Sequence, residues 1–168
     1  PWLEVSQDAI GRGRKNRNNW EKERLAYLNS AFAQPDLNQL DTVILSNDFS
    51  SNFNIENLDE NIIQDNPHFQ YGGEFQGRKL LNSFMEKRHA RYIYNISKPY
   101  YTTRSCSRLS PYLAYGCLSV REVYQTVKEE LDNDSTNGNL EKYLIRLFWR
   151  SHYICLLYTS DAADEVDG

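Results

Sequence analysis

The chain has 168 residues, of which 40% are hydrophobic and 13% aromatic, and it carries 19 Lys and Arg against 23 Asp and Glu. This composition is typical of a soluble globular protein of about one domain. No run approaches the roughly 18 consecutive apolar residues of a membrane-spanning helix, and the opening Pro-Trp-Leu-Glu does not resemble a signal peptide. Three cysteines are too few and too irregular for a disulfide framework or a metal site. We therefore expect a cytoplasmic protein that holds no metal and contacts no membrane.

Charge is distributed unevenly along the chain. Residues 1–70 carry six basic and eleven acidic side chains, residues 71–160 carry thirteen and eight, and the last eight residues carry four acids and no base. Without those last eight residues the chain is neutral. The basic middle part has the sign expected of a surface that faces phosphate groups.

The first part of the chain shows little periodicity. A basic block closed by an aromatic residue spans residues 11–20, and on composition alone it is a solvated loop. Residues 31–68 are rich in Asn, Asp, Gln and Ser, which predicts a long connecting segment with one short strand at residues 42–45. Because loops this long are uncommon inside a compact domain, we interpret the segment as a linker between two domains.

Helical signals follow the linker. Apolar residues that share one helix face predict a helix over residues 74–97, and Pro99 should end it. Ser110 as N-cap, with Pro111 at the first helical position, predicts the start of a short second helix. Gly116 is placed to end that helix.

The next two predicted helices carry the clearest signals. Ser119 and Glu122 form a capping-box pattern, which predicts a helix that continues to about residue 131. The fourth helix has apolar residues at helical spacing, which predicts a core-facing stripe of Leu140, Tyr143, Leu144, Leu147 and Phe148. A second face of this helix combines basic and aromatic side chains, namely Arg146, Trp149, Arg150 and Tyr153.

Hydroxyl and basic side chains gather just ahead of the second predicted helix, in the segment 105–111 with the sequence Ser-Cys-Ser-Arg-Leu-Ser-Pro. Free backbone N–H groups and the positive end of a helix dipole favour an anion, while hydroxyl and guanidinium groups donate to its oxygens. The segment therefore suits a phosphate group. An ordinary capped loop is the alternative that spacing alone leaves open.

Residues 105–121 resemble the flavin-domain signature of the DNA photolyase and cryptochrome family, usually written T-S-R-L-S-P-Y-L-x-x-G-x-L-S-x-R. Three further matches occur in the family's order: Gly72-Gly73-Glu74, then Phe148-Trp149-Arg150 downstream, and the block at residues 11–20 upstream. The resemblance implies an all-α fold that is the N-terminal part of the family's helical FAD-binding domain, preceded by an irregular interdomain linker. Residues 1–70 would then be the end of the antenna domain and the linker, and residues 71–154 the partial FAD-binding domain.

The same resemblance implies which residues hold FAD. Tyr92, judged by its distance from Pro99, is the expected flavin-contacting tyrosine, and Tyr94 is the alternative. Cys106 stands where the family has a threonine, which replaces a hydroxyl donor with a weak thiol, and Ser105 is a candidate substitute. The full expected cofactor-binding set is Tyr92, Cys106, Ser107, Arg108, Leu109, Ser110, Tyr143, Arg146 and Arg150.

Damaged DNA is the partner that the resemblance implies. Trp149 matches the tryptophan that stacks on a flipped-out pyrimidine dimer, with core packing as the alternative. Arg146 stands where repair enzymes carry an acid or a glutamine, and it cannot accept a hydrogen bond as those side chains do. The residues expected to contact DNA are Arg146, Trp149, Arg150 and Tyr153.

The function implied by the resemblance is that of a flavoprotein, monomeric at full length, which uses blue light to repair pyrimidine dimers; the fragment alone should be inactive. A cryptochrome photoreceptor that binds FAD without repair is the alternative, and a light-independent nucleic-acid-binding module is a third interpretation. His68, His89 and His152 have no carboxylate or cysteine at ligand spacing, so we expect them at the surface or in packing contacts.

The end of the chain departs from the family. Helical periodicity fails after Ile154, and residues 155–165 are similar to the in-frame translation of a transposase sequencing adapter. We therefore interpret residues 155–168 as non-native read-through, in which Cys155 and the acidic cluster have no function.

Overall fold

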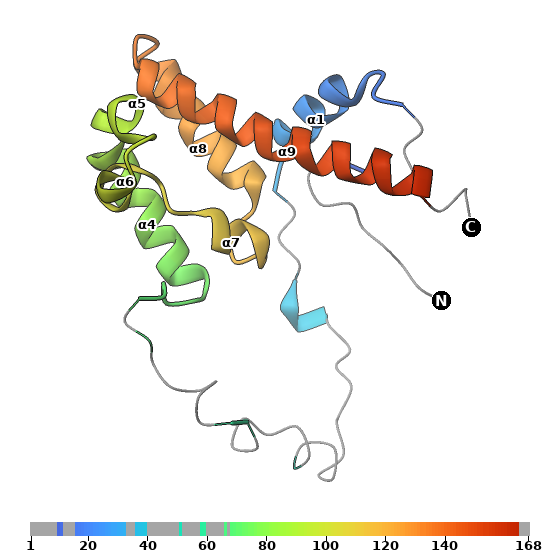
Figure 1. Cartoon of the computed structure of the whole chain (residues 1–168), viewed down its shortest axis with the longest axis horizontal. Coiled ribbons are helices and arrows are strands. Elements are labelled where there is room, and N and C mark those ends of the chain that lie inside the picture. The colour runs from blue at the N-terminus through green and yellow to red at the C-terminus, as the bar shows by residue number, and fades with distance from the viewer. Residues whose placement is uncertain are drawn as a thin grey trace. The chain divides into compact units, whose positions relative to one another are not determined.

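The computed structural model describes residues 10–11, 16–32, 36–39, 51, 58–59, 66 and 68–164. The chain divides into two compact units, one formed by Pro1–Ser30 with Gly72–Gly168 and the other by Ala31–Tyr71. Regular structure in the described residues is helical, without a strand, which confirms the predicted all-α class (Figure 1). The strand predicted at residues 42–45 and much of the predicted linker lie outside the described residues. The second unit contains the short 3-10 helix η2 (Leu37–Gln39).

The first unit is organised around one long helix, α9 (Gly138–Asp164), which crosses it from α5 towards α1 (Figure 1). It packs against α8 (Val120–Asn133) and α5 (Tyr92–Asn95), and α1 (Trp20–Leu28) packs against α8. The remaining helices are α4 (Glu74–Glu86), η4 (Arg88–Arg91), α6 (Pro99–Ser105) and α7 (Ser110–Ala114).

The single helix predicted over residues 74–97 is wrong, because the chain leaves helical geometry at Lys87 (φ −142°). Beyond it, Arg88 turns inward and donates from Nη2 to the Leu80 carbonyl oxygen at 2.6 Å and from Nε to the Ser83 hydroxyl at 3.0 Å. Pro99 also does not end a helix but begins α6, where its fixed φ suits the first turn.

The caps of α7 and α8 follow the prediction in part. Leu109, not Ser110, is the N-cap residue of α7, and Gly116 follows that helix with a φ of 71°, as expected of a helix stop. The Ser119 hydroxyl caps α8 by accepting from the Arg121 backbone N–H at 3.2 Å. Glu122 does not complete the capping box, because its carboxylate pairs with Arg78 of α4.

The main core lies between α4, α5, α7, α8 and α9. Leu140, Tyr143 and Leu147 of the predicted stripe are buried in it, and Phe84 is fully buried with its ring centroid 4.8 Å from that of Tyr143. Gly77 allows α4 to approach closely, since a Cβ there would lie 3.0 Å from side-chain atoms of Leu118 and Tyr112. This packing brings α5, α9 and the segment that precedes α7 together.

A smaller core joins α1 to α9. Trp20 packs on Phe148 with ring centroids 5.4 Å apart, and the buried Arg24 lies over the same Phe148 ring. Arg17 hydrogen-bonds His152, while His89 bonds the Phe84 carbonyl oxygen at 2.9 Å, so both histidines lie in packing contacts.

Helix α9 continues past Ile154 to Asp164, and Cys155 is buried against Ile10 and Trp20. The loss of periodicity after Ile154 is therefore not matched by a helix end. The non-native origin of residues 155–168 stays a prediction, because a conformation carries no information about the source of the codons. Across the described residues, no helix is long and apolar enough to cross a membrane.

Candidate functional site

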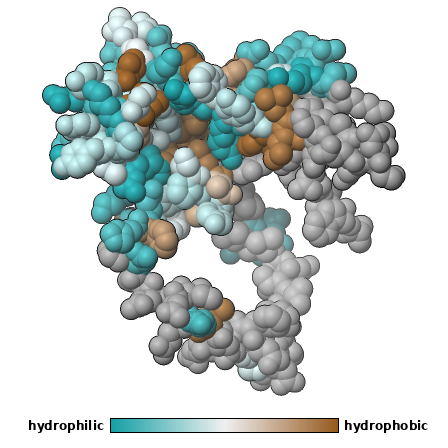
Figure 2. Space-filling view, viewed as in Figure 1, coloured by the Kyte–Doolittle hydropathy of each residue, from teal (hydrophilic) through white to brown (hydrophobic). Residues whose placement is uncertain are grey.

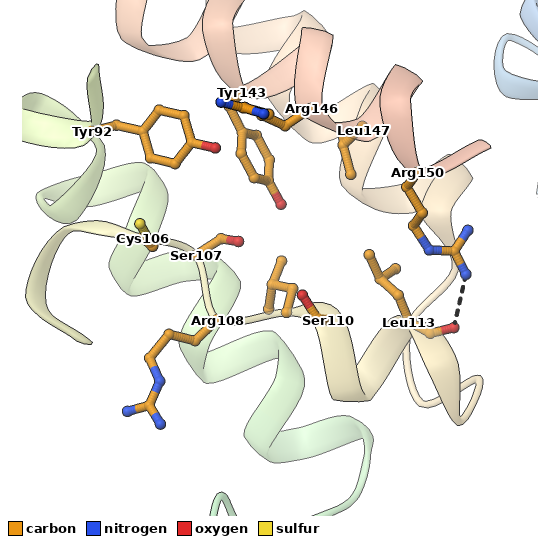
Figure 3. A pocket seen from close by; sticks show the side chains of 11 residues that line it. Tyr92, Cys106, Ser107, Arg108, Ser110, Leu113, Tyr143, Arg146, Leu147 and Arg150 are labelled. Carbon is orange, nitrogen blue, oxygen red and sulfur yellow. Dashed lines mark hydrogen bonds between the residues drawn. The ribbon is translucent and has the colours of Figure 1, made fainter. Parts of the chain in front are cut away.

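A cavity of about 380 Å³ opens between the segment that leads into α7 and one face of α9 (Figure 3). All nine residues of the expected cofactor-binding set line it. Leu113 and Leu147 complete the lining. Sequence reasoning missed these two as site residues, although both occur within its patterns, Leu113 in the family signature and Leu147 in the core stripe. Residues from three separate stretches of the chain thus meet at one cavity.

Four hydroxyl groups face this cavity (Figure 3), from Ser107 and Ser110 on one side and from Tyr92 and Tyr143 on the other. Burial raises the pKa of Tyr143 to about 12, although its hydrogen bond with Ser107 acts in the opposite direction. Burial likewise raises the pKa of Tyr92. Both phenols therefore keep their protons at neutral pH and can donate hydrogen bonds.

The backbone ahead of α7 has a shape that suits anions. Arg108 has a φ of 59°, in the left-handed region, and the next residue, Leu109, is right-handed at φ −87° and ψ −6°. Successive residues of opposite hand form a nest, in which backbone N–H groups converge on a negative charge. Because α7 has five residues, the nest is a better source of anion attraction than the helix dipole.

The Arg108 side chain does not take the place expected of it. In Figure 3 its guanidinium points away from the cavity, which Arg108 lines with its other atoms. The left-handed backbone turns the side chain outward and costs about 1–3 kcal/mol for a residue other than glycine. Any ion pair between this guanidinium and a ligand in the cavity requires a different rotamer.

Arg88 supports the site from behind, a role that no sequence pattern marked. It donates to the main-chain oxygens of Cys106 and Ser107, the latter at 3.3 Å, in addition to its bonds to α4. Burial, and then the nearby Arg108, lower the pKa of Arg88. One side chain therefore ties the end of α4 to the loop that lines the cavity.

The residues named as alternatives at two positions differ in whether they line the cavity. Tyr92 is buried and lines the cavity, whereas Tyr94 is 70% exposed and lies under the Lys98 ammonium, outside the lining. Ser105 is also outside the lining, and its hydroxyl accepts a 2.7 Å hydrogen bond from Asn95. Cys106 does line the cavity, and burial raises the pKa of its thiol.

Helix α9 contributes two arginines. Arg150 donates to the Leu113 carbonyl oxygen at 3.5 Å. Arg146 stacks on Trp149, with Cζ 4.2 Å from the ring centroid, and among the described residues its buried Nε has no hydrogen-bond partner. A buried donor without a partner is costly, which makes Arg146 a group that a bound ligand could satisfy.

The remaining residues expected to contact DNA lie on the accessible side of α9. Trp149 is 41% exposed and Tyr153 is 62% exposed. Part of the Trp149 side chain is therefore accessible, and core packing stays the alternative for the covered part. An aromatic face remains accessible beside the cavity, where a base could stack.

Two curated proteins resemble this chain. Over 89 residues, 51% of the chain, it is 33% identical to the deoxyribodipyrimidine photo-lyase of Halobacterium salinarum, and over 93 residues, 55% of the chain, it is 33% identical to the deoxyribodipyrimidine photo-lyase of Alkalihalophilus pseudofirmus. The chain covers 18% of the length of each relative. No family model matches the chain, and no solved structure matches it. The two relatives confirm the resemblance to the photolyase family that the motifs indicated.

Proposed function

We propose that this chain, which resembles the deoxyribodipyrimidine photo-lyases, is part of a longer flavoprotein that binds FAD in the cavity between α7 and α9 and uses blue light to repair pyrimidine dimers in DNA. One observation carries the proposal. The nine residues expected to hold the cofactor, spread between positions 92 and 150, all line one cavity. A chance resemblance of motifs would give no reason for these residues to meet.

The donors around the cavity fit the diphosphate of a dinucleotide. Ser107 and Ser110 offer hydroxyls, the nest at Arg108 and Leu109 offers backbone N–H groups, and the protonated Tyr143 offers another donor. Leucine side chains line the same cavity and suit an apolar ring. A volume of about 380 Å³ is at the small end for a ligand site, so we expect further contacts from parts of the protein outside this chain.

The bound flavin would supply light absorption and electron transfer. The residues of this chain bind and orient the cofactor. The loop that Arg88 supports holds its phosphate end, and the leucines exclude water. Trp149, exposed beside the cavity, can stack on a base that has left the duplex, for about 1–3 kcal/mol per base. Arg146, stacked on Trp149, can donate to base or phosphate oxygens but cannot accept from a base.

Flavin reconstitution tests the cofactor part of the proposal. In the full-length protein, Ser107→Ala and Ser110→Ala together should weaken FAD binding about 30-fold, since each hydroxyl hydrogen bond contributes about 1 kcal/mol. Ser97→Ala, a change at an exposed serine outside the lining, is the matched control. A full-length protein without flavin absorbance after reconstitution would contradict the assignment.

The alternatives make different predictions for the same protein. A cryptochrome photoreceptor would bind FAD but leave dimers unrepaired in light, whereas a light-independent nucleic-acid-binding module would bind DNA without flavin. The names of both relatives favour repair, since each is called a photo-lyase.

We also propose that residues 155–168 are adapter read-through and not part of the natural protein. The proposal rests on the similarity of residues 155–165 to a translated adapter and on the lost periodicity. Sequencing the same locus with a different library chemistry should give other codons after Ile154, and recovery of the same codons would overturn the proposal.

A further inference from the structure

A second cavity, of about 370 Å³, lies among η4, α5 and α6 and shares no lining residue with the first. Four of its lining residues are basic and none is acidic: Lys87, Arg88, Arg91 and Arg104. Tyr101, Asn95, Ser105 and Ala90 complete the lining. None of the residues expected to bind FAD or DNA belongs to this basic pocket.

The sequence around the basic pocket concentrates positive charge. Residues 87–121 contain seven Lys and Arg and no Asp or Glu, in a chain whose total charge is −4. The surface over α5 and α6 is mainly hydrophilic (Figure 2). Like charges that lie close together repel one another, so a bound anion stabilises such a cluster.

Three of the four cations are exposed and make no ion pair within the described part of the chain: Lys87, Arg91 and Arg104. Arg88, the fourth, donates hydrogen bonds to main-chain carbonyl oxygens. Two other cations of the same unit are neutralised, since Arg78 pairs with Glu74 and Glu122, and Lys128 pairs with Asp132. Three exposed cations without an ion pair in the described part of the chain thus surround one pocket, whose lining holds no acid.

Aromatic side chains stand among these cations. Tyr101 lines the pocket at 45% exposure, and Tyr94 and Tyr100 on the same two helices are more than two-thirds exposed. At the base of the pocket, Asn95 and Ser105 are buried and hydrogen-bonded to each other. Exposed tyrosines between Lys and Arg are typical of surfaces that bind nucleic acids, where cations contact phosphates and rings contact sugars or bases.

We propose that the basic pocket binds a backbone phosphate of a nucleic acid through Lys87, Arg91 and Arg104. Long exposed side chains around an open pocket suit a phosphodiester, which continues on both sides, better than a small anion that a closed site would enclose. The choice of nucleic acid as the ligand rests on the proposed function, but the pocket needs no flavin. It adds a DNA contact apart from the cavity that Trp149 borders.

The test measures duplex binding by the full 168-residue chain between about 50 and 200 mM salt, a range over which binding to phosphates weakens steeply. The variant K87A/R91A/R104A is compared with K22A/K79A/K128A, which removes the same charge elsewhere on the unit. For each phosphate that a variant no longer neutralises, the slope of log Kd against log salt should fall by about 0.9. We expect a fall of at least that size for the pocket variant, and a smaller one for the control. Equal slopes and affinities for the two variants would overturn the proposal.

Further measurements separate loss of a phosphate contact from loss of fold. Far-UV circular dichroism checks that each variant retains its helices, and Arg91→Glu against Lys22→Glu repeats the comparison with one substitution. Titration with inorganic phosphate separates the sources of the anion: a pocket variant that loses phosphate binding while it binds duplex like the control would show that the ligand is a free phosphate, and would overturn the assignment to nucleic acid.

Failure of this inference is distinguishable from failure of the proposed function. The FAD content of the full-length protein depends on the first cavity, and we expect K87A/R91A/R104A to leave it unchanged. Salt-dependent DNA binding through the basic pocket in a protein that takes up no flavin would support the inference and contradict the proposed cofactor.

Discussion

Arg88 and Ser107 are joined by a hydrogen bond of 3.3 Å from the guanidinium to the main-chain carbonyl oxygen. The bond connects the start of η4, directly after α4, to the loop that lines the first cavity. A side chain in the basic pocket thus holds the backbone of the candidate cofactor site, so the positions of the two sites are linked through one residue.

Replacement of Arg88 should destabilise the fold. Arg88→Met removes the donor to several carbonyl oxygens and leaves half-buried acceptors unsatisfied, which should lower the free energy of unfolding by about 2–4 kcal/mol. Denaturant titration measures the change. Arg91→Met is the control, because Arg91 is exposed and lies in the same turn, and it should change the free energy by less than about 0.5 kcal/mol. Equal effects of the two substitutions would contradict the bracing role.

Replacement of Arg108 by glycine should stabilise the fold. Because Arg108 has a φ of 59°, Gly at this position relieves left-handed strain, and we expect a gain of about 1 kcal/mol in the free energy of unfolding. Arg108→Ala keeps the strain and is the control. FAD affinity should change little in Arg108→Gly if the guanidinium stays outside the cavity (Figure 3). A large loss of FAD affinity would show that the side chain turns inward when the cofactor binds.

Stability should fall at alkaline pH because of Tyr143. Burial raises its pKa to about 12 in the folded state, whereas an unfolded tyrosine titrates near pH 10. Between these values the unfolded state loses its proton first, so the free energy of unfolding should decrease by about 1.4 kcal/mol per pH unit. Below pH 10 this contribution is fully present. Denaturant titrations of the wild type and Tyr143→Phe check the difference, and identical pH dependence above pH 10 would contradict the burial of the phenol.

Trp149 should matter for DNA and little for folding. Because the side chain is 41% exposed, Trp149→Ala should change the free energy of unfolding by about 1 kcal/mol or less. In the full-length protein the same change should weaken binding to dimer-containing DNA by a factor of about 5 to 150, the equivalent of removing one base stack. Tyr115→Ala, at a tyrosine that is 87% exposed, provides the comparison. Loss of stability without loss of affinity would support core packing instead.

Much of the candidate site could be predicted from sequence, because its residues occur in motifs with a fixed local order. The stripe of Leu140, Tyr143 and Leu147 could also be predicted, because helical periodicity places these residues on one face of α9. The break at Lys87 could not be predicted, because it accompanies contacts between Arg88 and a loop that lies eighteen and nineteen residues further along the chain.

The outward Arg108 and the basic pocket were missed for a similar reason. The position of Arg108 in a phosphate-binding motif predicts that its guanidinium points into the cavity. The backbone of Arg108 is left-handed, and the motif does not encode that conformation. The three exposed cations of the basic pocket come from different elements: Lys87 is the C-cap of α4, Arg91 lies in η4 and Arg104 lies in α6. Tertiary packing brings them around one cavity. Charge along the sequence indicated a basic segment but not where its side chains converge.

The most direct test of the proposed function is photorepair by the full-length protein loaded with FAD. A duplex that contains one cyclobutane pyrimidine dimer is incubated with the protein in blue light and in the dark, and restored pyrimidines are counted by chromatography. We predict repair in light, none in the dark, and none in light without flavin. A flavin-loaded protein that binds the duplex but repairs no dimer under blue light would contradict the proposed function.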